Sequence, residues 1–164
     1  MTVTVTVQVQ PAMALLNKII QAAGDARAAF SSIAFTLEQR IALGFEDQRD
    51  PWGNPWAPLS DTTLNRRRDG GRDGVSILRD TGVMFGSLAS SATADAVEIS
   101  ISGPQVLAQQ FGNPANRFFN TPKGRPAPIP ARPMLPIRPG GQADLPPDWM
   151  QEVVDVMTAH LVPA

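Results

Sequence analysis

The residues of this chain that could take part in chemistry are carboxylates, arginines and one histidine. The 164-residue sequence has no cysteine and a single histidine, which excludes thiol nucleophiles, thiolate metal sites and histidine-rich metal clusters. Two carboxylates could support metal-assisted hydrolysis, but the central aspartates fall in predicted turns and helix starts, where Asp serves local structure. These are Asp47, Asp50, Asp61, Asp69, Asp73 and Asp80. We expect no catalytic residue, no metal site and no enzymatic activity.

A cofactor site is not indicated either. Gly70-Gly71 followed by Gly74 has neither the preceding strand nor the lysine that a phosphate-binding loop needs. His160 falls on the apolar stripe of the last predicted helix, near its C-terminus, where the helix dipole favours a cation. We interpret this histidine as structural and expect no bound cofactor.

The run Arg66-Arg67-Arg68 is the strongest candidate for contact with nucleic acid. Arg72 and Arg79 lie nearby, but interleaved aspartates weaken the positive field. Arginines at a helix end also complement the helix dipole, so a solvated helix end is the competing interpretation. No aromatic residue is interleaved for base stacking, which argues against single-strand binding. Contact with a partner protein, or with DNA passing close by, is the remaining alternative.

Composition predicts one loop-rich domain over residues 1–164. The length suits a single domain with its own core, and the 16 prolines and 13 glycines exceed the usual shares of about 5% and 7%. Charged residues make up 18% against the usual ~25%, which suggests that partners cover part of the surface. The net charge of −1 gives no global attraction to nucleic acid. With no signal-peptide pattern and no apolar run near ~20 residues, we expect cytoplasmic synthesis and no membrane partner.

Hydrophobic periodicity predicts an α+β fold, with a small, mostly antiparallel sheet packed with about five helices. Val alternates with Thr and Gln over residues 2–10, which predicts a strand at the edge of its own sheet or, alternatively, one that pairs with another chain. Residues 97–101 predict a second strand, with 89–93 as its hairpin partner. Helical spacing covers one kinked or two separate helices over 15–44, then 60–69, 80–88, 104–112 and 146–161.

Residues 113–141 form a proline-rich segment in which regular hydrogen-bonded structure cannot persist. Apolar residues such as Phe118 and Ile137 would be unusual in a disordered linker, so we expect an ordered, extended arm. Its charged residues are all basic, whereas residues 144–155 carry only acidic ones. Neighbouring subunits could therefore join head to tail by complementary charge. The alternative is that the arm folds over its own acidic helix.

Four sequence motifs occur in a specific order along the chain. They are Phe45…Gly53…Trp56-Ala57-Pro58-Leu59-Ser60…Thr63, Ile77-Leu78-Arg79-Asp80-Thr81-Gly82, Ala108-Gln109-Gln110-Phe111-Gly112 and Ile129-Pro130-Ala131-Arg132-Pro133. In this order and spacing they resemble the phage virion morphogenesis family, the Mu-like tail completion proteins of tailed bacteriophages. The resemblance covers residues 15–161. The chain departs from the family pattern at two places, at Leu107 to Gln110 before Phe-Gly and at Met134-Leu135 after the last motif. Both departures keep apolar bulk, so we expect them to affect only the detailed contacts with partners.

The resemblance implies a structural protein of the virion neck that completes the tail and joins it to the head. Such subunits are expected to form a ring, here a hexamer, around the channel through which DNA passes. The implied partners are further copies of the chain, the tail tube protein and the head connector or stopper, with non-specific proximity to packaged DNA. The implied location is the virion tail or neck, assembled in the host cytoplasm. A head-side stopper or adaptor, or a small DNA-binding regulator, are the alternatives.

The expected contact residues lie in the arm and in the predicted loop of residues 46–58, which carries Trp52 and Trp56 and which we call the tryptophan loop. We expect interface contacts from Ile129, Pro130, Arg132, Pro133, Met134, Trp52 and Trp56. Core packing is the alternative for the two tryptophans. Arg66, Arg67 and Arg68 would face the DNA channel, where weak and non-specific phosphate contact would let DNA slide.

Overall fold

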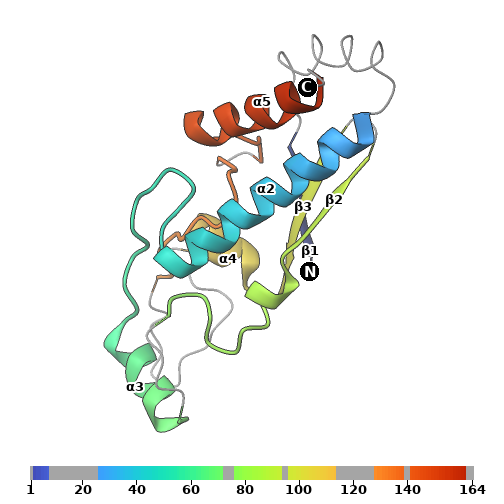
Figure 1. The fold of residues 1–164 in the computed structure, drawn as a ribbon. Helices are drawn as coiled ribbons and strands as arrows, with labels where there is room; N and C mark the ends of the chain where they lie inside the picture. Colours follow the sequence, from blue (N-terminus) through green and yellow to red (C-terminus); the bar gives the residue numbers. More distant parts are fainter. Residues whose placement is uncertain are drawn as a thin grey trace.

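The structure is a computed structural model that describes residues 2–7, 26–71, 76–93, 96–113, 128–138 and 141–161. The elements in these ranges are β1 (Thr2–Val7), α2 (Ala26–Asp47), α3 (Asp61–Asp69), the 3-10 turn η1 (Phe85–Ser87), β2 (Ala89–Ala92), β3 (Val97–Ser102), α4 (Val106–Phe111) and α5 (Pro147–Leu161). The predicted α+β class is confirmed (Figure 1). Four α-helices lie in the described ranges, and the helix expected over residues 15–23 falls outside them.

The three described strands form one antiparallel sheet in the order β1-β3-β2. β1 pairs with β3 from Thr2 opposite Ser102 to Val7 opposite Val97. β2 pairs with the other side of β3, and the backbone N–H of Thr93 donates to the carbonyl oxygen of Ala96 over 2.9 Å at the hairpin end. The predicted hairpin is confirmed, and among the described strands the first one lies at an edge of the sheet, as predicted.

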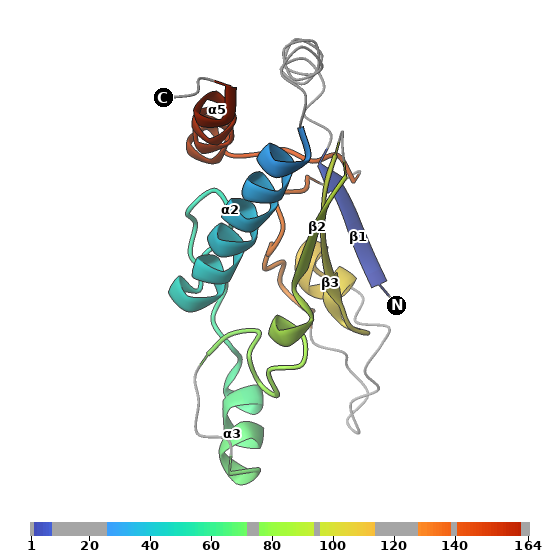
Figure 2. The ribbon, with the colours of Figure 1, turned by 45° about the vertical axis from the view of Figure 1, so that its right-hand side comes forward.

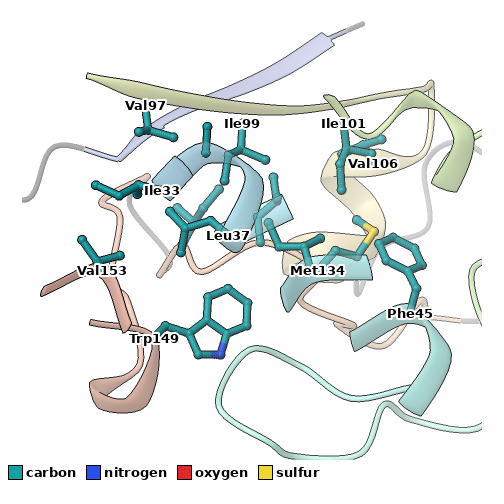
Figure 3. Close-up of a cluster of buried hydrophobic side chains, with 14 of the residues drawn as sticks. Ile33, Leu37, Phe45, Val97, Ile99, Ile101, Val106, Met134, Trp149 and Val153 are labelled. Atoms are coloured by element: carbon teal, nitrogen blue, oxygen red, sulfur yellow. The ribbon is translucent and has the colours of Figure 1, made fainter. Parts of the chain in front are cut away.

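Helix α2 is the central element, because it lies between the sheet and α5 (Figure 2). Its buried residues recur every three or four positions, which places them on one face of the helix. They are Phe30, Ile33, Ala34, Leu37, Ile41 and Phe45. From the sheet, Val97, Ile99 and Ile101 complete this core (Figure 3).

Helix α5 packs along α2 through Trp149, Val153 and Met157, all buried. At the rim of this contact the Arg40 guanidinium of α2 binds the Glu152 carboxylate. His160 lies within the angular range of this stripe, about 20° round the helix from Trp149, and its Nε2 lies 3.4 Å from Ser32 Oγ of α2. The ring is nevertheless exposed, because His160 is the last residue but one of the helix.

The helix predicted over residues 80–88 is replaced by a loop and the single turn η1. Gly82, with φ +75°, is left-handed and interrupts the predicted helix, and Leu78 just before the predicted range is also left-handed, with φ +63°. Met84, Phe85 and Leu88 nevertheless pack against the core. The helical spacing of these apolar residues therefore reflected burial in an irregular segment, and the helix assignment was wrong.

Helix α3 begins where the sequence predicts, with Ser60 as its N-cap. The backbone N–H of Thr63 donates to Ser60 Oγ over 3.4 Å, and Gly70 follows the last helical residue. This helix lies at the end of the molecule opposite α5 (Figure 2). Its position makes the arginines of α3 remote from the acidic residues of α5.

Candidate assembly site

The described part of the arm, residues 128–138, starts at a backbone bridge to the end of α4. The N–H of Asn113 donates to the carbonyl oxygen of Ile129 over 2.8 Å, and the N–H of Ile129 donates to the carbonyl oxygen of Asn113 over 3.0 Å. Gly112 makes this approach possible, since its φ is +75° and a Cβ there would lie 3.0 Å from the Ala131 nitrogen. The glycine of the third motif thus positions the fourth motif.

Arg132 binds the tryptophan loop and α4 to the arm. Its Nε donates to the carbonyl oxygen of Ala57 over 2.7 Å and one terminal nitrogen donates to that of Pro58 over 2.9 Å. The other terminal nitrogen donates to Gln109 Oε1 over 3.1 Å. The residue is only 6% exposed. Burial, and secondarily the positive charge of Arg67, lowers the pKa of Arg132 below its ordinary value.

Gln110 holds the arm through its side-chain amide and is 2% exposed. Its Nε2 donates to the carbonyl oxygen of Leu135 over 2.9 Å. Its Oε1 accepts from the N–H groups of Met134 and Leu135 over 2.9 and 3.1 Å. The amide therefore substitutes for a neighbouring strand and satisfies backbone groups that would otherwise be buried without partners.

Trp56 makes a second connection between the loop and the arm. Its indole Nε1 donates to the carbonyl oxygen of Pro133 over 2.8 Å. Its ring stands edge-on to Phe45 of α2, with 5.4 Å between centroids and 81° between planes. The indole is buried, so it serves both as a core residue and as a hydrogen-bond donor.

Arg67 extends this network to the second motif. One terminal nitrogen donates to the carbonyl oxygen of Ser76 over 2.8 Å, and Nε lies 3.3 Å from Asp80 Oδ1. Arg67 is 6% exposed, whereas Arg66 and Arg68 are exposed. The expectation that all three arginines face a channel is therefore wrong for Arg67, whose guanidinium is directed into its own subunit.

We call this cluster, made of Trp56, Arg67, Asp80, Gln110 and Arg132, the arm junction. Hydrogen bonds in this cluster join the first, third and fourth motifs. Asp80 of the second motif pairs with Arg67, whose charge acts on Arg132. The side chains of Arg132, Gln110 and Trp56 donate hydrogen bonds to backbone carbonyls. These bonds hold the arm, α4 and the tryptophan loop together. Within the described ranges no group of three or more His, Asp or Glu side chains is placed to hold a metal ion.

The predicted contact residues divide into two groups. The side chains of Trp56, Arg132 and Met134 are buried inside their own subunit, and Figure 3 shows Met134 among core residues. This corrects the expectation that they face a neighbour, and it supports the core-packing interpretation of Trp56. The group that keeps accessible surface comprises Trp52, Ile129, Pro130 and Pro133. Their contact with a partner stays a prediction.

The described charges of the arm are used within the subunit. Arg138 forms an ion pair with Asp144, and its guanidinium lies 5.9 Å from the centre of the Trp52 ring. Acidic Glu152 on α5 pairs with Arg40. In the described part of the arm, opposite charges therefore pair within one subunit. The basic residues Arg117, Lys123 and Arg125 lie outside the described residues.

Sequence analysis missed the exposed apolar residues of α2. Phe35 is 64% exposed and Leu43 is 49% exposed. They lie eight positions apart on the side of the helix facing away from the core, where Ala28, Ser31 and Gln39 are also exposed. They could have been recognised from the sequence, because neither Phe35 nor Leu43 follows the helical spacing of the buried residues Phe30, Ile33, Leu37 and Ile41. Exposed apolar groups gathered on one face are typical of surfaces that contact other molecules.

In the described part of the chain, no helix combines the length and apolarity required to cross a bilayer. No curated protein and no solved structure shows significant similarity to the chain. The model of the phage virion morphogenesis family, in contrast, matches residues 7–162. This match spans all four motifs of the arm junction. The chain therefore belongs to the phage virion morphogenesis family.

Proposed function

We propose that this protein is a tail completion protein of a bacteriophage, which forms a ring at the end of the tail and joins the tail to the head. The family match over residues 7–162 carries the proposal. Its mechanism is assembly, in which buried apolar contacts supply affinity and charged groups supply orientation. No chemical reaction is part of this role.

The arm junction suits a subunit that must transmit contacts without deforming. Arg132, Gln110 and Trp56 link α4, the tryptophan loop and the arm by side-chain bonds of 2.7 to 3.1 Å. Interfaces bind more tightly when they are organised before contact, because less conformational entropy is lost on association. The accessible residues next to the junction, Ile129 and Pro130, would then have a fixed position in the subunit before a partner binds them.

In this proposal six copies surround the channel, one face of the ring contacts the tail tube protein and the other contacts the head connector or stopper. A closed ring needs heterologous contacts, in which two different surfaces of one subunit meet. The exposed face of α2 with Phe35 and Leu43 supplies apolar surface for such contacts. Exposed Arg66 and Arg68 would contact DNA phosphates only weakly. The protein would be found in the neck of the virion after assembly in the host cytoplasm.

Two alternatives lead to different observations. A head-side stopper or adaptor would use the same fold but remain with the head when tails are removed. A small DNA-binding regulator would act before assembly and be missing from the particle. The regulator is disfavoured by Arg67, because the middle arginine of the basic run is bound to Asp80 and to the Ser76 carbonyl.

A phage lacking the gene for this chain tests the role. We expect filled heads and separate, unfinished tails in the lysate, and we expect purified protein added to that lysate to restore joined particles. Protein that is pre-incubated with isolated tails should restore joining. If joining were restored only after pre-incubation with heads, the protein would be the head-side stopper. Normal particles from the deletion phage would contradict the proposal.

A further inference from the structure

The sheet has two outer edges that no described strand covers. β1 and β2 lie on either side of β3, so each has one paired and one open side among the described strands. β1 opposes all six residues of β3, and β2 opposes four of them. An open edge presents a row of backbone N–H and C=O groups to which another strand can bind.

The pairing defines which backbone groups point outward. The N–H of Thr93 donates to the Ala96 carbonyl, so this pair is hydrogen-bonded. Hydrogen-bonded and non-bonded pairs alternate in an antiparallel ladder, which makes the Ser90–Ile99 pair non-bonded and turns the N–H and C=O of Ser90 outward. Ala92 follows the same pattern. The residues of β3 whose backbone groups face away from β2 pair with Val3, Val5 and Val7 of β1. The backbone groups of Thr2, Thr4 and Thr6 therefore point outward from β1.

Neither edge has the features that prevent strand pairing. Exposed edges are usually blocked by charged side chains, prolines or bulges. Residues 2–7 and 89–92 contain no charged residue and no proline. The six paired positions of β1 follow one another without a bulge. An uncharged, regular edge of this length is expected to be covered in the working state of the protein.

We propose that β1 of one subunit pairs with β2 of a neighbouring copy, so that the sheets of the ring join edge to edge. This deepens the proposed function and rests on it, because it assigns the subunit contact of the ring. The two edges lie on opposite sides of the same sheet, which is the arrangement a heterologous, ring-closing contact requires. A contact of β1 with β1 would instead give an isologous dimer.

The new ladder would be parallel. β1 and β2 both run antiparallel to β3, so they run in the same direction as each other. A rotation about an axis along the strands preserves this direction in the neighbouring copy. Each outward residue of one strand then lies between two outward residues of the other, for example Ser90 between Thr4 and Thr6 of the neighbour. In that register, Ala89 lies opposite Thr4 of the neighbour.

The absence of cysteine from the sequence permits a direct test by cross-linking. Thr4 and Ala89 both oppose Ser100, so within one subunit they are two strand spacings apart, about 9.6 Å. A disulfide needs Cα atoms within about 6.8 Å. The variant Thr4→Cys/Ala89→Cys can therefore cross-link β1 to β2 only between subunits. Thr6→Cys/Ser91→Cys tests the same register one step along the strands.

The experiment uses particles made by complementing the deletion phage with each variant, followed by mild oxidation and non-reducing electrophoresis. We expect the double variants to give a ladder of covalent oligomers up to the full ring. Each single variant should stay monomeric. Dimers from Thr4→Cys alone would overturn the proposal in favour of isologous pairing. Joined particles without any cross-link would overturn edge pairing and leave the proposed function intact, whereas particles that lack the chain would overturn that function as well.

A second variant removes one outward donor without breaking the ladder to β3. Ala92→Pro deletes an N–H that points outward, and proline is tolerated on edge strands in this position. Ala92→Val adds similar bulk and keeps the N–H, which makes it the matched control. We expect the proline variant to fold but to enter particles at least tenfold less than the valine variant. Equal incorporation of the two would contradict the pairing of β2.

Discussion

The indole nitrogen of Trp56 donates a hydrogen bond to the carbonyl oxygen of Pro133 over 2.8 Å and so joins two residues that lie 77 positions apart, in the first and the fourth motif. The same tryptophan packs edge-on against Phe45 of α2. A residue of the loop thereby links the core helix to the proline-rich arm. This contact explains why an extended arm without regular secondary structure has a defined path.

Replacement of Trp56 by Phe tests the contribution of this bond. Phe keeps most of the apolar contact with Phe45 but leaves the Pro133 carbonyl without its donor, which we expect to cost about 1–2 kcal/mol of unfolding free energy. Urea unfolding followed by circular dichroism measures the difference. Trp52→Phe is the matched control, because Trp52 is only half-buried, and a change within about 0.5 kcal/mol is expected there. Equal effects of the two substitutions would argue against the bond.

Arg132→Lys tests the guanidinium fork of the arm junction. A lysine ammonium cannot reproduce the planar geometry that serves Ala57, Pro58 and Gln109 together. We expect a loss of about 1–3 kcal/mol from the carbonyls left unsatisfied. Arg138→Lys makes the same change at an exposed position and should change stability by less than about 0.5 kcal/mol. A fully stable Arg132→Lys variant would mean that charge alone holds the arm.

The three consecutive arginines should behave differently on replacement by alanine. Arg67→Ala removes the partner of Asp80, which is 31% exposed, and we expect a loss of roughly 2–3 kcal/mol, below the range for a fully buried pair. Arg66→Ala and Arg68→Ala should leave thermal unfolding nearly unchanged. If all three variants were equally stable, the buried position of Arg67 would be contradicted.

Gly112→Ala tests the close approach of α4 and the arm. An added Cβ would lie 3.0 Å from the Ala131 nitrogen and 3.1 Å from the Ile129 oxygen, at a φ of +75°. Gly53→Ala is the control, since its φ is +85° but nothing lies within 4 Å of the added atom. The control should lose about 1 kcal/mol from backbone strain alone, and Gly112→Ala should lose clearly more. Equal losses in thermal or urea unfolding would show that the bridge from Asn113 to Ile129 can shift without cost.

The Arg40–Glu152 pair makes a pH-dependent contribution to stability. The hydrogen bond from Arg40 lowers the pKa of Glu152, so this stabilisation is present above the ordinary glutamate pKa of about 4.3 and is lost as the pH falls through the lower value of the folded state. Because both side chains are partly exposed, its size is limited to roughly 0.2–1 kcal/mol. Glu152→Gln should be less stable than wild type at pH 7, and the difference should vanish in acid. A difference that persists once Glu152 is protonated in the folded state as well would contradict this assignment.

Periodicity in the sequence was sufficient to predict the regular elements. The alternation of Val3, Val5 and Val7 predicted β1, and the stripe from Phe30 to Phe45 predicted the buried face of α2. The stripe on α2 reports burial against a neighbouring layer, which is local information. The helix over 80–88 failed because its apolar spacing was the same as that of a buried loop. The left-handed residue inside it is Gly82, and a glycine is the usual sequence marker of such a position.

The arm junction could not be assembled from the sequence, although all of its residues were noticed. Arg66, Arg67 and Arg68 are chemically equivalent along the chain, and only tertiary structure brings Asp80 to the middle one. Arg132 and Met134 lie in a segment whose prolines predict extension, and extension does not reveal which side is buried. The sequence predicts partner contacts for Trp56 and Arg132, with core packing as the alternative for Trp56, whereas in the structure both residues and Gln110 hold the subunit together.

A density map of the intact neck, with every chain traced, would show whether this protein forms the ring between tail and head. We expect a closed ring of this protein between the tail tube and the head connector, with each arm fixed by Arg132 and Gln110 in its own subunit. Density filled entirely by other proteins would show that the protein is no part of the neck.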